Sequence, residues 1–171
     1  EILKKIIGEY PKGFRAPCWS ISKDDFWVYD FLEKQGFLYS SSLFPVNMGL
    51  YGDAKFPTGI FKPKRNGKIL EIPIRPFEIL GLRIPFSGGI YFRLMPRQLI
   101  KFFIKRLNRR NKSIVLYLHP WEFCPNIPKV RTSILGQIIT YWSLKNTEAK
   151  LEYILKNFDL VSIREGLKNE F

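Results

Sequence analysis

The residues best suited to chemistry lie around the only histidine of the chain. Residues 113–118 form an aliphatic, β-branched run with the pattern of a buried strand, and His119 follows directly. Pro120 cannot donate to a β-ladder, so the histidine is expected at or near the strand's end. Catalytic groups collect at the ends of parallel strands, and imidazole titrates near neutrality. His119 is therefore a candidate proton-transfer group. The alternative is a histidine that only satisfies a local hydrogen bond.

The charge balance favours anionic partners. The 171 residues include 28 Lys and Arg against 15 Asp and Glu, a formal net charge of +13. Such a surface suits nucleic acid, acidic glycans, nucleotide-linked sugars or anionic lipid headgroups. The lysines are dispersed along the chain, so compositional drift with a weak anionic preference is the simpler interpretation. The length and the 46% hydrophobic content suit one domain with a hydrophobic core.

The cysteines and the hydropathy favour a cytoplasmic location, including the membrane surface. Cys18 and Cys124 lie far apart, and no CxxC spacing occurs, so neither a zinc knuckle nor a redox motif is predicted. Free thiols in a reducing compartment are expected. No transmembrane segment and no signal peptide are predicted. The chain begins without methionine in what resembles a helix end, which suggests a fragment or a processed product.

Hydrophobic periodicity predicts helices and strands in alternation. A helix end over residues 1–9 precedes helices over residues 23–35, 96–110 and 144–156, the first with Ser22 as its N-cap and Asp25 completing a capping box. Strands are expected over residues 37–42, 69–74, 113–118 and 158–163, with a short one before a proline-containing loop at residues 16–18. Residues 44–67 are predicted to form a long loop and residues 82–89 an irregular turn region. This order predicts an α/β fold with mostly parallel strands.

Five stretches carry a resemblance to a known family. They are GFRAPCWSI (13–21), GFLYSSSLFP (36–45), SGGIYFRL (87–94), LYLHPWE (116–122) and WSLKNTE (142–148). In order and spacing they resemble the polysaccharide deacetylase (NodB-homology) family, in the branch associated with exopolysaccharide export and exosortase gene clusters. The resemblance implies a distorted (β/α) barrel that hydrolyses N- or O-acetyl groups of sugars with a divalent, zinc-like metal.

The resemblance covers only part of the family's catalytic domain. The family holds its metal with an aspartate and two histidines in motifs that precede the first of these stretches. Residues 1–12 contain neither Asp nor His, and His119 is the only histidine. Residues 1–171 are therefore expected to be the C-terminal part of the catalytic domain, a partial barrel without metal ligands of its own. Because its strand edges are open, we expect it to pair with a missing N-terminal half, to pair with a second copy, or to aggregate.

The resemblance implies roles for four polar positions. Arg15 corresponds to the arginine that pairs with the catalytic base, and the backbone N–H of Cys18 falls where the family places an oxyanion donor. The family more often has an aromatic residue at that position, which here comes one later, as Trp19. His119 corresponds to the general acid that protonates the leaving amine or alkoxide. Glu71 is a candidate to orient His119. The alternatives are a surface arginine and a strand-end glutamate in solvent.

The aromatic residues Trp19, Tyr91 and Trp121 are candidates for stacking on the sugar rings of an acetylated polysaccharide or oligosaccharide. The alternative is that they belong to the core.

The function expected is that of a carbohydrate deacetylase fragment in exopolysaccharide biosynthesis. Two other classes stay open. One is a catalytically inactive glycan-binding relic, and the other is a basic nucleic-acid-binding domain built on the Lys101–Lys112 helix. No nucleic-acid motif is present, so no specific nucleic acid is predicted.

Overall fold

The computed structural model describes residues 1–49 and 51–168. The chain divides into two compact units. Unit 1 comprises Glu1–Arg75 together with the C-terminal segment that begins at Ser162, and unit 2 comprises Pro76–Val161. Both units contain helices and strands, so the predicted mixed α/β class is confirmed. The residues described form no closed barrel.

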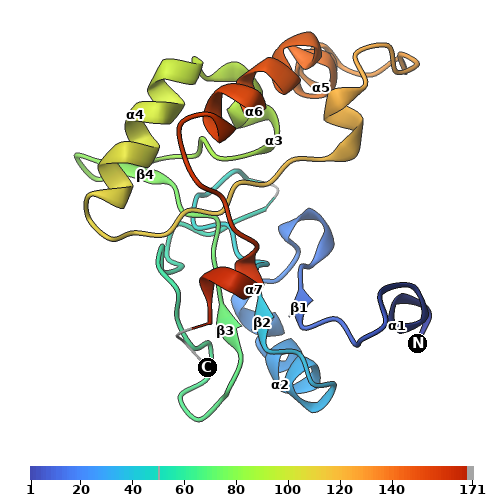
Figure 1. The fold of residues 1–171 in the computed structure, drawn as a ribbon, viewed down its shortest axis with the longest axis vertical. Helices are drawn as coiled ribbons and strands as arrows, with labels where there is room; N and C mark the ends of the chain where they lie inside the picture. The colour runs from blue at the N-terminus through green and yellow to red at the C-terminus, as the bar shows by residue number, and fades with distance from the viewer. Residues whose placement is uncertain (50, 169–171) are drawn as a thin grey trace. The chain divides into compact units, whose positions relative to one another are not determined.

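Unit 1 contains a small parallel sheet (Figure 1). It consists of β1 (Gly13–Phe14), β2 (Tyr39–Ser40) and β3 (Leu70–Glu71), in that spatial order. Parallel neighbours need crossover connections, and α2 (Trp27–Lys34) lies within the first of them. The second is the predicted long loop, which follows β2 and carries no named helix or strand in its described residues. The strands lie where they were expected but are shorter than predicted.

The helix predicted over residues 23–35 forms, with a tighter first turn. The backbone N–H and Oγ of Ser22 donate to Asp25 Oδ2 at 2.9 and 2.6 Å, which completes the predicted capping box. A 3₁₀ turn, η2 (Lys23–Asp25), therefore leads into α2. Gly36 follows with a φ of +80°, the left-handed conformation that favours glycine after a helix. The buried residues of the unit 1 core are Ala16, Ile21, Tyr29, Leu32, Leu43, Phe56 and Ile69.

The two ends of unit 1 are helical. The first helix is α1 (Ile2–Ile7), and Gly8 follows it with a φ of +81°, as the predicted helix end requires. The strand predicted over residues 158–163 is wrong. No strand forms there, and α7 begins at Ile163. The reason is local, because Ser162 and Glu165 exchange the hydrogen bonds of a capping box, which favours a helix start over an extended backbone.

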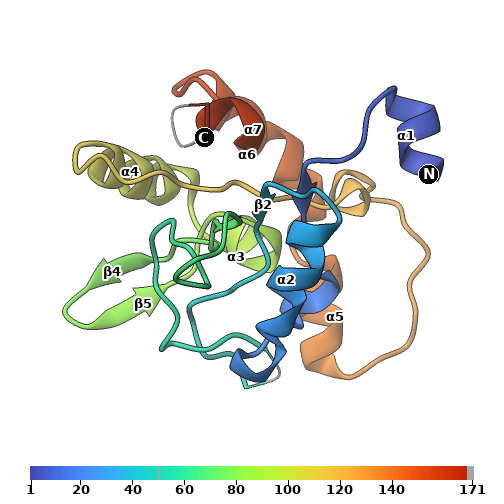
Figure 2. The same cartoon turned by 90° about the horizontal axis from the view of Figure 1, so that it is seen from below.

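Unit 2 begins with an antiparallel hairpin (Figure 2). It joins β4 (Phe77–Ile79) to β5 (Leu82–Ile84). Leu80 and Gly81 both have positive φ, at +48° and +79°, as a two-residue hairpin turn requires. The predicted irregular region at residues 82–89 therefore begins with a strand. The turn was missed because leucine is an unusual first residue in such a turn, where Asn or Asp is typical.

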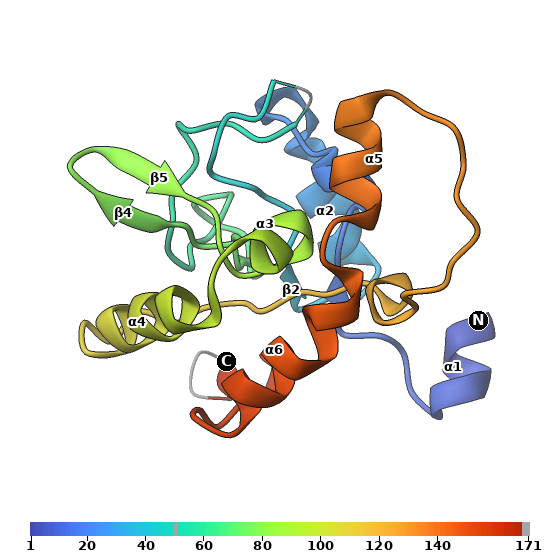
Figure 3. The same ribbon diagram turned by 90° about the horizontal axis from the view of Figure 1, so that it is seen from above.

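Helices are the main regular elements of unit 2 (Figure 3). They are α3 (Gly89–Leu94), α4 (Arg97–Asn108), α5 (Ile134–Tyr141) and α6 (Thr147–Leu155), with the short 3₁₀ turns η3 (Pro120–Phe123) and η4 (Leu144–Asn146). Two of them confirm the helices predicted over residues 96–110 and 144–156, whereas α5 was not predicted. The buried core residues are Phe77, Phe86, Phe92, Ile100, Phe103, Ile104, Leu107 and Ile154. None of the helices in the described residues is long and apolar enough to cross a membrane.

The strand predicted over residues 113–118 is reduced to a single bridge. Tyr117 pairs in parallel with Gly88, through Tyr117 N–H to the Ser87 carbonyl at 3.0 Å and Gly89 N–H to the Tyr117 carbonyl at 3.3 Å. A Cβ on Gly88 would lie 2.3 Å from the ring and the carbonyl oxygen of Tyr117. Only glycine therefore fits there, and this close approach places the segment that ends at His119.

Candidate functional site

The turn that begins after His119 fixes the backbone of the candidate acid. The His119 N–H donates to Glu122 Oε2 at 2.8 Å, and the Glu122 N–H donates to the His119 carbonyl at 3.0 Å. The imidazole is exposed. It stacks on the Trp121 ring, with centroids 6.0 Å apart at 14°, and meets the Tyr117 ring edge-on at 6.1 Å. An exposed imidazole on a fixed backbone is suited to proton transfer.

A buried ion pair supports this turn. Glu122 is fully buried, and its Oε1 accepts from Arg93 Nε at 2.7 Å, with Arg93 itself only 2% exposed. The other guanidinium nitrogens donate to the carbonyls of Ile139 at 2.6 Å, Thr140 at 3.2 Å and Trp142 at 2.7 Å. The fork of the guanidinium thus joins η3 to the C-terminal end of α5. The carboxylate that holds His119 is itself held by a permanent charge.

A second cation lies close to Arg93. Lys150 Nζ donates to the carbonyls of Phe92 at 3.3 Å, of Arg93, and of Met95 at 2.8 Å, and so satisfies the C-terminal end of α3. Burial, together with the neighbouring charge of Arg93, lowers the pKa of Lys150. The Arg93 guanidinium also lies 5.2 Å from the centroid of the Trp121 ring. The backbone of the candidate acid, His119, is therefore held by a connected network of polar side chains within unit 2, formed by Glu122, Arg93 and Lys150.

Glu71, the other candidate carboxylate, is fully buried in unit 1. Its Oε1 accepts from the N–H groups of Ser42 at 2.8 Å and Leu43 at 2.9 Å, and its Oε2 accepts from the Tyr29 hydroxyl at 3.1 Å. Burial raises the pKa of Glu71, although the Ser40 side chain and these hydrogen bonds act in the opposite direction. Burial and the Glu71 charge also raise the pKa of Tyr29. The alternative of a glutamate in solvent is wrong, while the role of orienting His119 stays a prediction.

Arg15 is fixed at the end of β2. Its Nε donates to the Ser41 carbonyl and its Nη2 to Ser41 Oγ, both at 2.8 Å. Ser41 Oγ in turn donates to the carbonyl of Ile72 at 2.7 Å, and the N–H of Ala16 donates to Ser42 Oγ at 2.9 Å. These two buried serines belong to the GFLYSSSLFP stretch, in which the sequence predicted no role for them. Arg15 is exposed, as the alternative of a surface arginine expects, and its guanidinium is held by Ser41.

The backbone at Cys18 and Trp19 is strained. Both residues have a φ of +54°, a left-handed conformation that costs about 1–2 kcal/mol for a residue other than glycine. Such strain is concentrated at functional sites. The N–H of Cys18 has no hydrogen-bond partner within residues 1–49 and 51–168. This unpaired N–H is the group to which the resemblance assigns the oxyanion contact.

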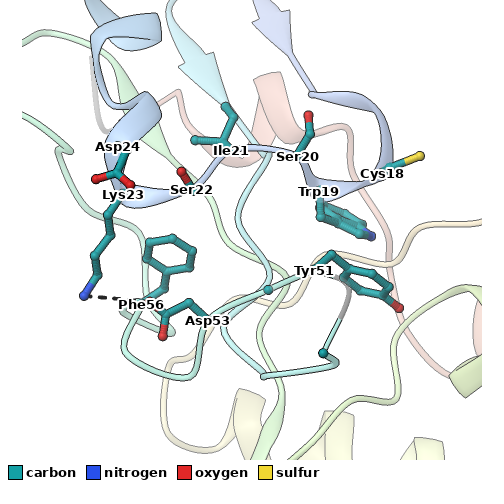
Figure 4. A pocket seen from close by; sticks show the side chains of 12 residues that line it. Cys18, Trp19, Ser20, Ile21, Ser22, Lys23, Asp24, Tyr51, Asp53 and Phe56 are labelled. Atoms are coloured by element: carbon teal, nitrogen blue, oxygen red, sulfur yellow. Dashed lines mark ion pairs between the residues drawn. The ribbon is translucent and has the colours of Figure 1, made fainter.

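A pocket of about 640 Å³ opens beside this turn (Figure 4). It is lined by residues 18–24, 49, 51–53 and 56. The rings of Trp19, Tyr51 and Phe56 are turned toward it, and Lys23 and Asp53 form an ion pair at 3.7 Å on its rim. Aromatic faces beside charged and hydroxyl groups suit a sugar ring, which has apolar faces and a polar edge. The pocket lies entirely in unit 1.

The structure groups the predicted site residues by unit. Arg15, Cys18, Trp19 and Glu71 belong to unit 1, whereas Tyr91, His119 and Trp121 belong to unit 2. Trp19 lines the pocket, Trp121 stacks on the imidazole, and Tyr91 is half-buried in α3.

Sequence reasoning assigned no role to Glu122 or Arg93. The spacing His-Pro-x-Glu at the start of a turn, which resembles a capping box, was the available signal for Glu122. Arg93 gave no comparable signal.

Residues 41–168 match the domain of unknown function DUF3473. The chain belongs to this family. The DUF3473 match includes Glu71, Arg93, His119 and Glu122, and it begins after Arg15 and Cys18. No curated protein and no solved structure matches the chain.

The divalent metal that the resemblance implies does not fit the residues of this DUF3473 chain. Across residues 1–49 and 51–168, no group of three or more His, Cys, Asp or Glu side chains could hold a metal ion. Four-coordinate zinc sites in enzymes use three protein ligands. We therefore assign no metal ligand to the chain.

Proposed function

We propose that this chain is the C-terminal part of a carbohydrate deacetylase, which releases acetate from N- or O-acetyl groups of a polysaccharide or its precursor. The observation that supports this proposal most is the way in which His119 is positioned. The only imidazole of the chain is exposed on a turn whose backbone is fixed by Glu122 and, through it, by Arg93. The five stretches that resemble the NodB-homology family support the same proposal.

In the proposed reaction, water adds to the acetyl carbonyl and the bond to the sugar nitrogen or oxygen breaks. The leaving amine or alkoxide needs a proton, and His119 is assigned as its donor. Cys18 belongs to the other unit, and its N–H keeps only the role that the resemblance implies, contact with the carbonyl oxygen as negative charge develops there. Activation of the water is not assigned to residues of this chain, because they do not fit a metal site. It requires a complementing segment.

A second candidate function is glycan binding without catalysis. The pocket beside Trp19 favours it, because this pocket combines aromatic rings with a polar rim and does not involve His119. The two functions differ in what His119 does. A deacetylase requires its proton, whereas a binding protein does not.

The test is acetate release from N- and O-acetylated oligosaccharides by the native polypeptide isolated from its source cell. For a deacetylase, His119→Asn should lower kcat by about 10²–10⁴-fold while oligosaccharide binding is kept. Trp19→Ala should instead raise KM. If the native protein releases acetate and His119→Asn leaves the rate unchanged, the assignment of His119 is wrong.

Two further outcomes would identify a different function. Oligosaccharide binding that Trp19→Ala abolishes and His119→Asn spares, with no acetate released, would favour the glycan-binding function. Nucleic-acid binding that falls steeply with salt would favour the basic-helix alternative instead. The intact mass of the native polypeptide shows in the same preparation whether a complementing segment is covalently attached.

A further inference from the structure

Helix α5 in unit 2 presents an apolar face to the solvent. Ile134 is 82% exposed and Leu135 67%, and Ile138, Ile139 and Trp142 are exposed as well. At 3.6 residues per turn, these five positions share one side of the helix. No residue of α5 is buried.

The polar side of α5 contacts the exposed loop that precedes the helix. Gln137 Nε2 donates to the Val130 carbonyl at 2.7 Å, and the Tyr141 hydroxyl accepts from the Val130 N–H at 2.7 Å. That hydroxyl also donates to the carbonyl of Pro128 at 3.4 Å. A surface helix of a globular protein normally turns its apolar side inward. In α5 the apolar side is exposed instead.

This orientation is held by backbone contacts. Arg93 donates to the carbonyls of Ile139 and Trp142 at the end of the helix, at 2.6 and 2.7 Å. At the other end, Ser133 Oγ accepts from the Gly136 N–H at 3.1 Å as an N-cap. The helix is therefore capped at its N-terminus and anchored by Arg93 at its C-terminal end, without the use of its large apolar side chains.

The segment that contains α5 carries charge of one sign. Residues 123–147 contain no Asp or Glu, and the basic residues Lys129, Arg131 and Lys145 of this segment are all exposed. An anionic partner with an apolar interior complements both properties.

We propose that the α5 face, together with Lys129, Arg131 and Lys145, is a docking surface for an anionic lipid bilayer. An interfacial helix lies in the membrane plane with its apolar side among the acyl chains and its basic residues at the headgroups. Trp142 at the end of the helix suits the headgroup level. At eight residues the helix cannot span a bilayer, so it would lie on the surface. The inference does not rest on the proposed deacetylase function.

A second copy of the chain fits this surface less well. A stable protein interface buries about 800 Å² per partner and involves roughly 20–30 residues on each side. The apolar face has five side chains, those of Ile134, Leu135, Ile138, Ile139 and Trp142. Pairing two such faces would also bring their basic residues together, in a protein with a formal charge of +13.

The experiment is co-sedimentation of the full chain with vesicles of mixed phosphatidylglycerol and phosphatidylcholine, compared with phosphatidylcholine alone. The wild type should bind the anionic vesicles preferentially. Ile134→Gln/Leu135→Gln should weaken this binding by at least about tenfold, and Lys129→Gln/Arg131→Gln by about tenfold at low salt. Both variants replace exposed residues, so circular dichroism should show an unchanged fold.

The matched control is Lys105→Gln/Arg106→Gln, which removes the same charge from α4. Vesicle binding of this variant should stay within about twofold of wild type. The proposal is overturned if the wild type binds neutral and anionic vesicles equally or binds neither. It is also overturned if the α4 control weakens binding as much as Lys129→Gln/Arg131→Gln. A dimer without vesicle binding, dissociated by Ile134→Gln/Leu135→Gln, would assign the face to self-association instead.

Discussion

Each unit buries one glutamate completely, and the two are held in different ways. Glu71 in unit 1 accepts from neutral donors, the Tyr29 hydroxyl and two backbone N–H groups. Glu122 in unit 2 accepts from the guanidinium of Arg93 and from the His119 N–H. Both side chains are 0% exposed. Because burial is equal, the difference between the two sites lies in the charge of their partners.

The comparison indicates what each carboxyl group does. The charge of Glu122 is required, because without it the buried guanidinium of Arg93 loses its counter-ion. The charge of Glu71 has no counter-ion among the groups that bond it, and burial raises its pKa. Glu71 therefore serves as a hydrogen-bond acceptor that ties β3 to the turn after β2. Two equally buried glutamates therefore differ in their contacts: Glu122 forms an ion pair in unit 2, and Glu71 accepts hydrogen bonds from neutral groups in unit 1.

The largest effect is expected from removal of Arg93. Arg93→Met leaves Glu122 buried without a counter-ion and removes the donors to three carbonyls at the end of α5. We expect the free energy of unfolding to fall by about 3–5 kcal/mol, measured by urea denaturation. The control is Arg106→Met on the exposed side of α4, which should change it by less than about 0.5 kcal/mol. A loss below about 1 kcal/mol for Arg93→Met would show that the ion pair is not a support of unit 2.

Removal of the Glu122 charge should have the next largest effect. Glu122→Gln keeps the shape and an acceptor oxygen but leaves Arg93 with carbonyl partners only. The free energy of unfolding should fall by about 2–3 kcal/mol. Glu152→Gln, at an exposed position of α6, is the matched control and should have almost no effect. Equal stabilities of the two variants would contradict the ionic role.

A smaller loss is expected at Lys150, which is only partly buried. Lys150→Met keeps most of the aliphatic stem but removes three hydrogen bonds to carbonyls at the end of α3. We expect a loss of about 1–2 kcal/mol in the same denaturation measurement. Lys156→Met on the same helix removes an exposed ammonium and should change stability by less than about 0.5 kcal/mol. If both variants behave alike, the Lys150 contacts do not stabilise α3.

The smallest change in the free energy of unfolding should be that of Glu71→Gln at pH 5. It should stay within about 1 kcal/mol, because the amide oxygen can accept from both N–H groups.

The pH dependence of stability tests whether folding raises or lowers the pKa of Glu71. Since burial raises the pKa of folded Glu71, the folded state holds this proton more tightly than the unfolded chain. Wild type should lose this part of its stability as pH rises from about 4.3 through the folded pKa. Glu71→Gln should become more stable relative to wild type from pH 5 to pH 8. A relative stability that falls over this range would refute the raised pKa.

Local patterns predicted a good part of the fold. Ser22 with Asp25 marked the start of a helix, and Gly8 and Gly36 marked helix ends, because these signals act within one turn of the chain. The amphipathic period of α4 was equally clear, and its apolar side faces the core. Some errors had local causes, as at Ser162 and Leu80, and others arose where long-range pairing decides. Residues 113–118 have strand composition, but only Tyr117 forms a bridge, to Gly88, far away in sequence.

The candidate site was partly predictable. His119 and Trp121 were named from their types and positions, and the structure stacks their rings. Glu71 was named, but its burial was not expected, because the groups that bond it come from distant segments. Arg93 was missed because the apolar stretch around it does not indicate a buried charge. Its partner Glu122 is 29 residues away, a pairing that no local pattern contains.

The close approach at Gly88 has a consequence for tolerance to mutation. The position carries no side chain and takes no part in any proposed chemistry, yet a Cβ there would overlap the ring and the carbonyl oxygen of Tyr117. In a saturation library of single variants, position 88 should therefore be among the most restricted of the chain. It should be more restricted than the exposed His119, where most replacements would still fold. Depletion from such a library would then report how tightly two chain segments meet, not where a reaction takes place.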